Sequence, residues 1–143
     1  MTFLPVYLDS SAIVKLVVRE PETEALLTAL ERWPDRVSAA LSRVEVHRAL
    51  RRAGQPRSAH ARADAVLEAL VLIRLDDSVL GRAAAFTQPQ MRSLDAIHLA
   101  VALAIGDDPD AFITYDSRLA HAARQEGLTV LHPGARAKSP DHR

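Results

Sequence analysis

The sequence has no cysteine, few aromatic residues and no excess of either charge. The absence of cysteine excludes disulfides, thiolate metal ligands and cysteine nucleophiles. One tryptophan, two tyrosines and three phenylalanines are the only aromatic residues, which argues against a surface that recognises its partners mainly by stacking. The 18 basic and 18 acidic side chains balance, so a polyanionic partner has to be met by a local basic patch.

Long apolar segments are also missing. The longest, about residues 96–105, is interrupted by His98 and is too short to cross a bilayer, so we expect no membrane contact. The N-terminus has neither the basic start nor the apolar core of a signal peptide, and we expect a cytoplasmic protein. The length of 143 residues suits one domain. We place this domain at residues 1–133 and expect a flexible C-terminal tail at residues 134–143.

Short apolar segments alternate with segments of helical periodicity along the whole chain. Strands are predicted at residues 6–8, 37–39, 71–75, 112–114 and 129–131. Helices are predicted at residues 11–18, 22–33, 42–53, 58–70, 78–86, 93–105 and 117–126. This alternation is typical of an α/β fold with a mainly parallel central sheet.

Four acidic residues lie at junctions between a predicted strand and a helix, or in the first turn of a helix: Asp9, Glu45, Asp95 and Asp116. Each has a simple structural explanation. Ser42 and Glu45 have the spacing of a capping box, which is the favoured explanation for Glu45 taken alone. Asp9 and Asp116 suit helix N-caps, and Asp95 suits the positive end of a helix dipole.

The four acids mean more as a group. In a parallel sheet the junctions after the strands meet at one edge, so residues distant in sequence converge there. Several carboxylates at close range repel one another, and a bound divalent cation removes that conflict. Oxygen ligands without cysteine favour a hard ion such as Mg²⁺, with Mn²⁺ as the alternative. Such an ion is suited to phosphoryl chemistry.

Four segments carry a family resemblance: "YLDSSAIVKL", "SRVEVHRAL", "SLDAIHLAVAL" and "FITYDSRLA". In this order and spacing they resemble the PIN-domain ribonucleases, and most of all the VapC toxins of type II toxin–antitoxin pairs. The resemblance spans roughly residues 4–132. It implies a three-layer α/β/α domain and a Mg²⁺-dependent endoribonuclease that hydrolyses phosphodiester bonds with an activated water. The implied catalytic residues are Asp9, Glu45, Asp95 and Asp116.

The resemblance also implies a role for each of these residues. Glu45 would orient or deprotonate the attacking water, while Ser11 and Thr114 would hold carboxylates or waters in place. Residues 117–119 carry no further acid where many relatives have one, so one or two metal ions remain open. The implied metal ligands are Asp9, Asp95 and Asp116.

The partners implied by the resemblance are an RNA substrate, an antitoxin protein that covers the acidic groove, and a second copy of the chain in a homodimer. The arginine-rich segment at residues 47–62 begins directly after Glu45. Its arginines either contact RNA phosphates or form a solvated helical surface. The predicted substrate-binding residues are Arg48, Arg51, Arg52 and Arg118.

For two further residues, the sequence leaves two alternative roles open. His98 lies one helical turn after Asp95, so it is either a metal ligand or, as the surrounding apolar residues favour, a packed core residue. Lys15 lies either at the rim of the site or in solvent.

Several alternative functions fit parts of the pattern. A phosphatase of the haloacid-dehalogenase type needs a second acid two residues after the first, and this chain has Ser11 there. A receiver-like signalling module needs a late lysine, and no lysine lies between Lys15 and Lys138. The remaining alternatives are a housekeeping RNA-processing nuclease of the PIN type, a non-enzymatic metal-binding module, and an interaction protein whose acids are only caps.

Overall fold

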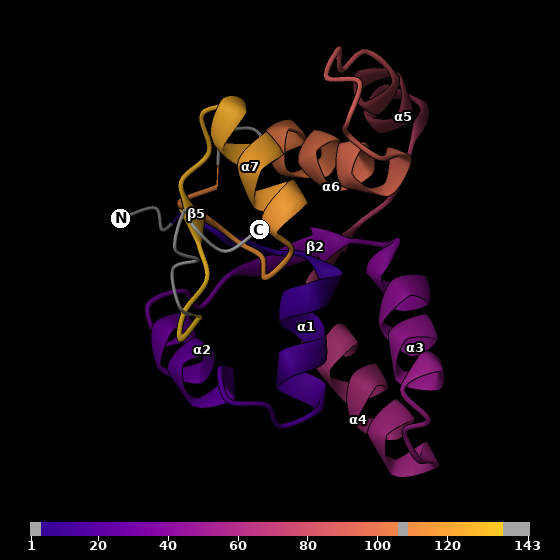
Figure 1. Cartoon of the computed structure of the whole chain (residues 1–143), viewed down its shortest axis with the longest axis vertical. Helices are drawn as coiled ribbons and strands as arrows, with labels where there is room; N and C mark the ends of the chain where they lie inside the picture. The colour runs from indigo at the N-terminus through magenta and orange to yellow at the C-terminus, as the bar shows by residue number, and fades with distance from the viewer. Residues whose placement is uncertain (1–3, 106–108, 136–143) are drawn as a thin grey trace, which may run out of the picture.

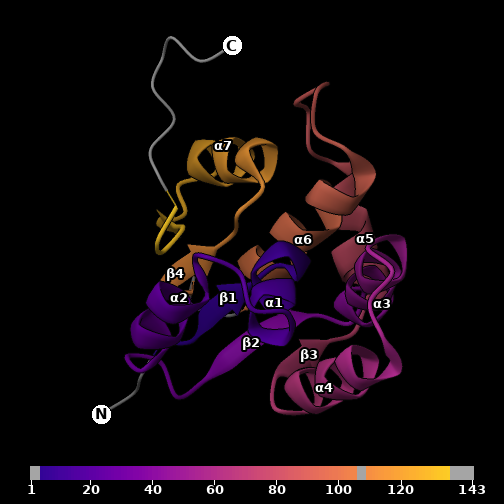
Figure 2. The ribbon, with the colours of Figure 1, turned by 60° about the horizontal axis from the view of Figure 1, so that its bottom comes forward.

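A computed structural model describes residues 4–105 and 109–135 of the chain. Within these residues five parallel strands form one sheet, in the order β3-β2-β1-β4-β5. Figures 1 and 2 show helices on both faces of this sheet. The three-layer α/β/α architecture predicted from the sequence is therefore confirmed.

The strands are short and largely apolar, as expected for strands covered on both faces. In the central pair, Leu8 lies opposite Ile113, and both residues are fully buried. The edge strand β3 is more exposed. The five strands are β1 (Val6–Leu8), β2 (Arg36–Ala39), β3 (Val71–Ile73), β4 (Ala111–Ile113) and β5 (Val130–Leu131).

Seven helices cover the two faces of the sheet within the described part of the chain. One face carries α1 (Ser10–Val17), α2 (Thr23–Leu30), α3 (Ser42–Arg52) and α4 (Arg57–Glu68). The other face carries α5 (Asp77–Ala84), α6 (Ser93–Ala104) and α7 (Ser117–Gln125). Each face therefore has its own apolar core.

Successive side chains of the central strands point to opposite faces of the sheet and therefore contribute to both cores. Leu8 and Ile113 face the core under α1–α4, whereas Tyr7 and Phe112 face the core under α5–α7. The rings of Tyr7 and Phe112 stack with their centroids 5.0 Å apart. Tyr7 is the one residue in this central pair of strands that brings a hydroxyl group into the core.

The predicted helices and strands are all present, and only their ends differ. The largest difference is at α2, which was predicted to run to residue 33 but ends at Leu30. The reason is a tighter turn, because the amides of Arg32 and Trp33 bond the carbonyls three residues before them. Trp33 then packs at the helix end, 4% exposed. The domain boundary at 133 stays a prediction, and residues 136–143 of the predicted tail lie outside the described residues.

The chain order of the strands fixes where the junctions meet. From the central strand β1 the chain runs outward to β2 and β3, and it then returns to the opposite side of β1 to form β4 and β5. Ligands of parallel sheets bind beyond the carboxyl ends of the strands at such a reversal. The segments after β1 and β4, which carry Asp9 and residues 114–116, are therefore placed side by side, and the amide of Asp9 bonds the Ile113 carbonyl at 3.2 Å.

Candidate active site

Asp9 lies at the centre of the site, directly after β1. Its Oδ1 accepts hydrogen bonds from the backbone amide of Ala12 at 3.0 Å and from Ser11 Oγ at 2.7 Å. Its Oδ2 accepts from Thr114 Oγ1, also at 2.7 Å, across 105 residues of sequence. Asp9 is thus the N-cap of α1, as predicted, but three donors hold its carboxylate far more firmly than a cap requires.

Thr114 joins the two central junctions. Besides donating to Asp9, its Oγ1 accepts from the backbone amide of Asp116 at 3.0 Å. The carboxylate of Asp116 caps α7, because its Oδ1 accepts from the amides of Arg118 and Leu119 at 2.9 and 3.1 Å. Ser11 and Thr114, the hydroxyl residues that the family resemblance implied for the site, therefore both contact the carboxylate of Asp9.

Asp95 lies in the first turn of α6 and is 8% exposed. Its Oδ2 is buried and has no hydrogen-bond partner within the described residues. Burial, and then the nearby charge of Asp116, raise the pKa of the Asp95 carboxyl. Buried polar atoms normally find a partner, so Asp95 is the acid whose environment is least satisfied by the protein alone.

Glu45 does not form the capping box that its spacing with Ser42 indicated. The N-cap of α3 is Leu41 with no side-chain cap, and Ser42 Oγ instead bonds Ser38 Oγ at 2.8 Å. Glu45 Oε1 lies 2.6 Å from His98 Nε2. The capping interpretation of Glu45 is therefore wrong, and the reason is that the buried histidine of α6 binds its carboxylate.

His98 is a residue of the site whose role the sequence left open. It is 2% exposed, and its Nδ1 lies 2.7 Å from the hydroxyl of Tyr7. Both ring nitrogens are thus engaged. Signals for this arrangement were present, since His98 lies one turn after Asp95 and Tyr7 precedes Asp9 by two residues, but only the packing of α6 on the sheet joins them.

Burial and charge act in opposite directions at the centre of the site. Burial raises the pKa of Asp9, although His98 and the hydrogen bonds from Thr114, Ser11 and Ala12 oppose this. For His98, burial lowers the pKa, but the hydrogen bond that it donates to Glu45 and the charges of Asp9, Glu45 and Asp95 outweigh this effect, so the net pKa is raised. The site is a concentration of negative charge partly offset by one histidine.

The donor set suits a hard cation. Among residues 4–105 and 109–135, no three His, Asp or Glu side chains form a ready-made group for a metal ion. However, the buried Asp95 Oδ2 lacks a partner, and the charge of Asp116 opposes ionisation of Asp95. A cation beside these carboxylates would give Asp95 Oδ2 a partner and offset the repulsion between Asp95 and Asp116, so the residues fit Mg²⁺ or Mn²⁺.

Two clefts are lined by residues that the sequence predicted for the site. One, of about 390 Å³, is lined by Glu45, by Arg48 and Arg52 of the same helix, and by Leu94. The other, of about 290 Å³, is lined by Arg118 together with residues 88–91 and α7. Three of the four predicted arginines therefore line a cleft, whereas the fourth, Arg51, is exposed outside both.

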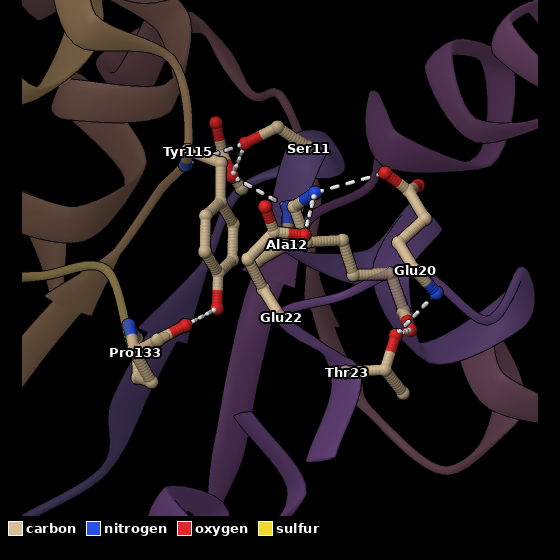
Figure 3. A network of polar contacts seen from close by, with 9 residues as sticks. Ser11, Ala12, Glu20, Glu22, Thr23, Tyr115 and Pro133 are labelled. Atoms are coloured by element: carbon tan, nitrogen blue, oxygen red, sulfur yellow. Dashed lines mark hydrogen bonds and ion pairs between the residues drawn. The ribbon is translucent and has the colours of Figure 1, made fainter. Parts of the chain in front are cut away.

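Lys15 is not in solvent, and it lies beside the site, because its Nζ is 4.8 Å from the centroid of the Tyr115 ring. Its Nζ donates to Glu20 and Glu22 at 3.0 Å each, and its side chain is 12% exposed. Figure 3 shows both glutamates beside α1, and the side chain of Tyr115 reaching to Pro133. The Tyr115 hydroxyl donates to the Pro133 carbonyl at 2.7 Å, while its backbone amide donates to Ser11 Oγ at 2.9 Å. The contacts of Lys15 and Tyr115 thus stabilise the side of the site next to Ser11.

Comparison with known proteins agrees with this fold. Residues 6–125 match the model of the PIN domain. The chain is 47% identical over 128 residues to Ribonuclease VapC46 of Mycobacterium tuberculosis, covering 90% of this chain and 97% of that protein. It is 40% identical over 134 residues to Ribonuclease VapC47 of the same species, covering 91% of this chain and 98% of that protein.

Solved structures have the same fold. Mycobacterium tuberculosis VapC20, described as a sarcin–ricin loop cleaving toxin, superposes with a TM-score of 0.69 at 17% identity, covering 90% of this chain and 99% of that one. A chain of a toxin–antitoxin complex from Klebsiella pneumoniae gives 0.62 at 21% identity, covering 79% and 88%. No helix in residues 4–105 or 109–135 is long and apolar enough to cross a membrane.

Proposed function

Because the chain belongs to the PIN-domain family and, within it, to the VapC ribonucleases, we propose that it is a Mg²⁺-dependent endoribonuclease and the toxin of a type II toxin–antitoxin pair. The observation that carries the proposal is the junction of β1 and β4, where Ser11 and Thr114 hold both oxygens of Asp9. Such fixed carboxylates suit a site that must hold a cation and an RNA phosphate in register. RNA is a cytoplasmic substrate, so we propose a cytoplasmic site of action.

Asp9, Asp95 and Asp116 are the residues that would hold the cation. When bound, a hard divalent cation supplies a water of lowered pKa and offsets charge on the phosphate oxygens. The chain's own contribution is to orient the donors. Thr114 sets the position of Asp9 and of the Asp116 backbone together, so both junctions are held at one place.

Glu45 is proposed to orient the attacking water or to accept its proton. It belongs to α3, and it is the acid that lines the larger cleft. Attack by water leaves a 5′-phosphate and a 3′-hydroxyl, with no covalent bond between protein and RNA. A 2′,3′-cyclic phosphate among the first products would contradict this assignment.

The larger cleft is the proposed path of the RNA. Arg48 lies about one turn after Glu45, and Arg52 lies one turn further along α3. Both side chains line the same cleft as Glu45, which places positive charge where a phosphate backbone approaches the acids. Arg118 of α7 is proposed to contact the RNA on the other side.

We propose an antitoxin protein as the partner that restrains this activity, and a homodimer as the form of the toxin. The structural relative from Klebsiella pneumoniae is a toxin–antitoxin complex, which supports the partner. Val44 and Leu94 are large apolar residues with exposed fractions of 59% and 47%, and both line the larger cleft. An antitoxin that covers these residues would also block the proposed RNA path.

The test uses purified wild type and Asp95→Asn with total bacterial RNA, each with Mg²⁺ or with EDTA. We expect discrete fragments that require both Mg²⁺ and Asp95. Cleavage that persists in EDTA would contradict the metal dependence. No cleavage by wild-type protein that still binds Mg²⁺ would favour a non-enzymatic metal-binding module instead.

A further inference from the structure

A chain of three hydrogen-bonded side chains, of which Tyr7 and His98 are buried, runs from the sheet to the proposed catalytic Glu45. The hydroxyl of Tyr7 in β1 lies 2.7 Å from His98 Nδ1, and His98 Nε2 lies 2.6 Å from Glu45 Oε1. Tyr7 is fully buried and His98 is 2% exposed. Tyr7 belongs to β1, Glu45 to α3 and His98 to α6. Along the chain, Glu45 lies 38 residues after Tyr7, and His98 lies 53 residues after Glu45.

The geometry fixes where the histidine carries its proton. A carboxylate oxygen is an acceptor, so the contact with Glu45 requires a proton on Nε2 of His98. If the ring is neutral, Nδ1 accepts from the Tyr7 hydroxyl. If the ring is charged, Nδ1 donates to the Tyr7 oxygen. The proton on Nε2 faces Glu45 in both states, and Tyr7 serves the other nitrogen in both.

Glu45 needs such a partner more than Asp9 and Asp116 do. Three donors hold Asp9, and two backbone amides hold Asp116. Glu45 has a longer side chain with more rotatable bonds, and it forms no capping box. The contact with His98 occupies only Oε1, so it restrains the position of this oxygen and leaves Oε2 available to a water.

We propose that His98 is the positioning residue of Glu45, and that Tyr7 holds the His98 ring in the orientation that directs Nε2 at the glutamate. This deepens the proposed function, on which it rests, because Glu45 is there assigned to the attacking water. His98 itself does not contact the reacting atoms. Hydrogen-bond partners of this kind affect activity by about 10- to 100-fold when removed, which sets the expected size of the effect.

The activity test is a double-mutant cycle between His98 and Glu45. Single-turnover cleavage of RNA at saturating protein is measured for wild type, His98→Leu, Glu45→Ala and the double variant. We expect His98→Leu to lose about 10- to 100-fold in rate with little change in RNA affinity. In the Glu45→Ala background the same substitution should have no further effect. Additive losses would mean that His98 acts by some route other than Glu45 and would overturn the proposal.

Conservative variants separate positioning from packing. His98→Gln keeps a side-chain N–H donor for Glu45 and an acceptor for Tyr7, so it should recover most of the rate that His98→Leu loses. Tyr7→Phe should lose part of the rate. Tyr115→Phe is its matched control, since it removes a tyrosine hydrogen bond of the same 2.7 Å length that leads to Pro133 instead. Equal losses in the two tyrosine variants would contradict the assignment of Tyr7.

A readout independent of cleavage separates this proposal from the proposed function. Imidazole ¹⁵N signals of the metal-free protein report whether Nε2 of His98 carries the proton, and the ¹³C signal of the Glu45 carboxyl reports whether the glutamate is held. We expect Nε2 to be protonated, and the Glu45 signal to shift in His98→Leu but not in Tyr115→Phe. If wild type fails to cleave RNA while these signals behave as expected, the proposed function falls and the contact stands. An unchanged Glu45 signal in His98→Leu would overturn the positioning role.

Discussion

Neutralising Asp95 should make the metal-free protein more stable. Asp95 is 8% exposed, one of its carboxylate oxygens lacks a partner within the described residues, and burial together with the charge of Asp116 raises its pKa. An unsatisfied buried polar atom costs about 1–3 kcal/mol, and more if it is charged. Asp95→Asn keeps a polar side chain of the same shape but removes the charge, so we expect a gain of about 1 kcal/mol, the lower end of that range.

The gain converts into a measurable shift of the melting temperature. An unfolding entropy of about 2.1 cal/mol/K per residue gives about 0.3 kcal/mol/K for 143 residues. One kcal/mol therefore corresponds to an increase of about 3 °C. The assay is calorimetric or fluorescence-monitored melting of wild type and Asp95→Asn in EDTA at neutral pH. Asp77→Asn is the matched control, because Asp77 also lies in the first turn of a helix but is exposed, and its melting temperature should change little.

Adding Mg²⁺ should reverse the order of the two proteins. A ligand at 100 times its dissociation constant stabilises the folded state by about 2.7 kcal/mol, which is roughly 9 °C by the same conversion. Wild type should gain this increment and Asp95→Asn should gain much less. A lower melting temperature of Asp95→Asn in EDTA would refute the reasoning, because the charged carboxylate would then stabilise the fold without a metal. Equal responses of both proteins to Mg²⁺ would refute the role of Asp95 as a ligand.

Three further predictions concern the same site. The pKa of Asp95 in the folded state is raised above its ordinary value of 3.8, so between these two pKa values the folded chain holds a proton that the unfolded chain has released. The stability advantage of Asp95→Asn over wild type should therefore grow as pH rises above 3.8 and then level off. Denaturant unfolding at several pH values measures this advantage, and an advantage independent of pH would contradict the prediction. Thr114→Val removes the donor to Asp9 and should cost about 1–3 kcal/mol in urea unfolding, whereas a cost near zero would show that the hydroxyl is dispensable. Arg48→Gln and Arg52→Gln should weaken RNA binding and each flatten its salt dependence by about 0.7 in log–log slope, while Arg51→Gln, outside both clefts, serves as the control and should leave the slope unchanged.

The positions of most helices and strands could be predicted from the sequence, because interactions between residues close together in the chain determine them. Residues 6–8 were predicted as a strand, and β1 has these bounds. The other predicted strands and helices are all present, although α2 ends three residues early in a tight turn. Apolar periodicity and helix-breaking residues determine such segments without knowledge of their neighbours. The alternation of strands and helices then restricts the sheet to a mainly parallel one, since consecutive strands joined by a helix run in the same direction.

The N-caps of the site could also be predicted from the sequence, because an N-cap hydrogen bond joins a side chain only to the first turn of its own helix. Asp9 and Asp116 cap α1 and α7 as predicted. The same local rule was wrong for Glu45, whose spacing with Ser42 indicated a capping box. A glutamate can satisfy its oxygens locally or across the fold, and the sequence around it does not reveal which.

What the tertiary structure alone decided is which distant side chains meet. The reversal of strand order at β1 brings Thr114 within 2.7 Å of Asp9, across 105 residues. The packing of α6 against the sheet places His98 between Tyr7 and Glu45, and it leaves one oxygen of Asp95 without a partner in the described residues. Residue types and local periodicity determined that acids would stand at the strand ends. Hydrogen bonds between segments far apart in sequence depend on distances that only the folded chain defines, and these distances decided which acid is held, which is unsatisfied, and which is bound by a histidine.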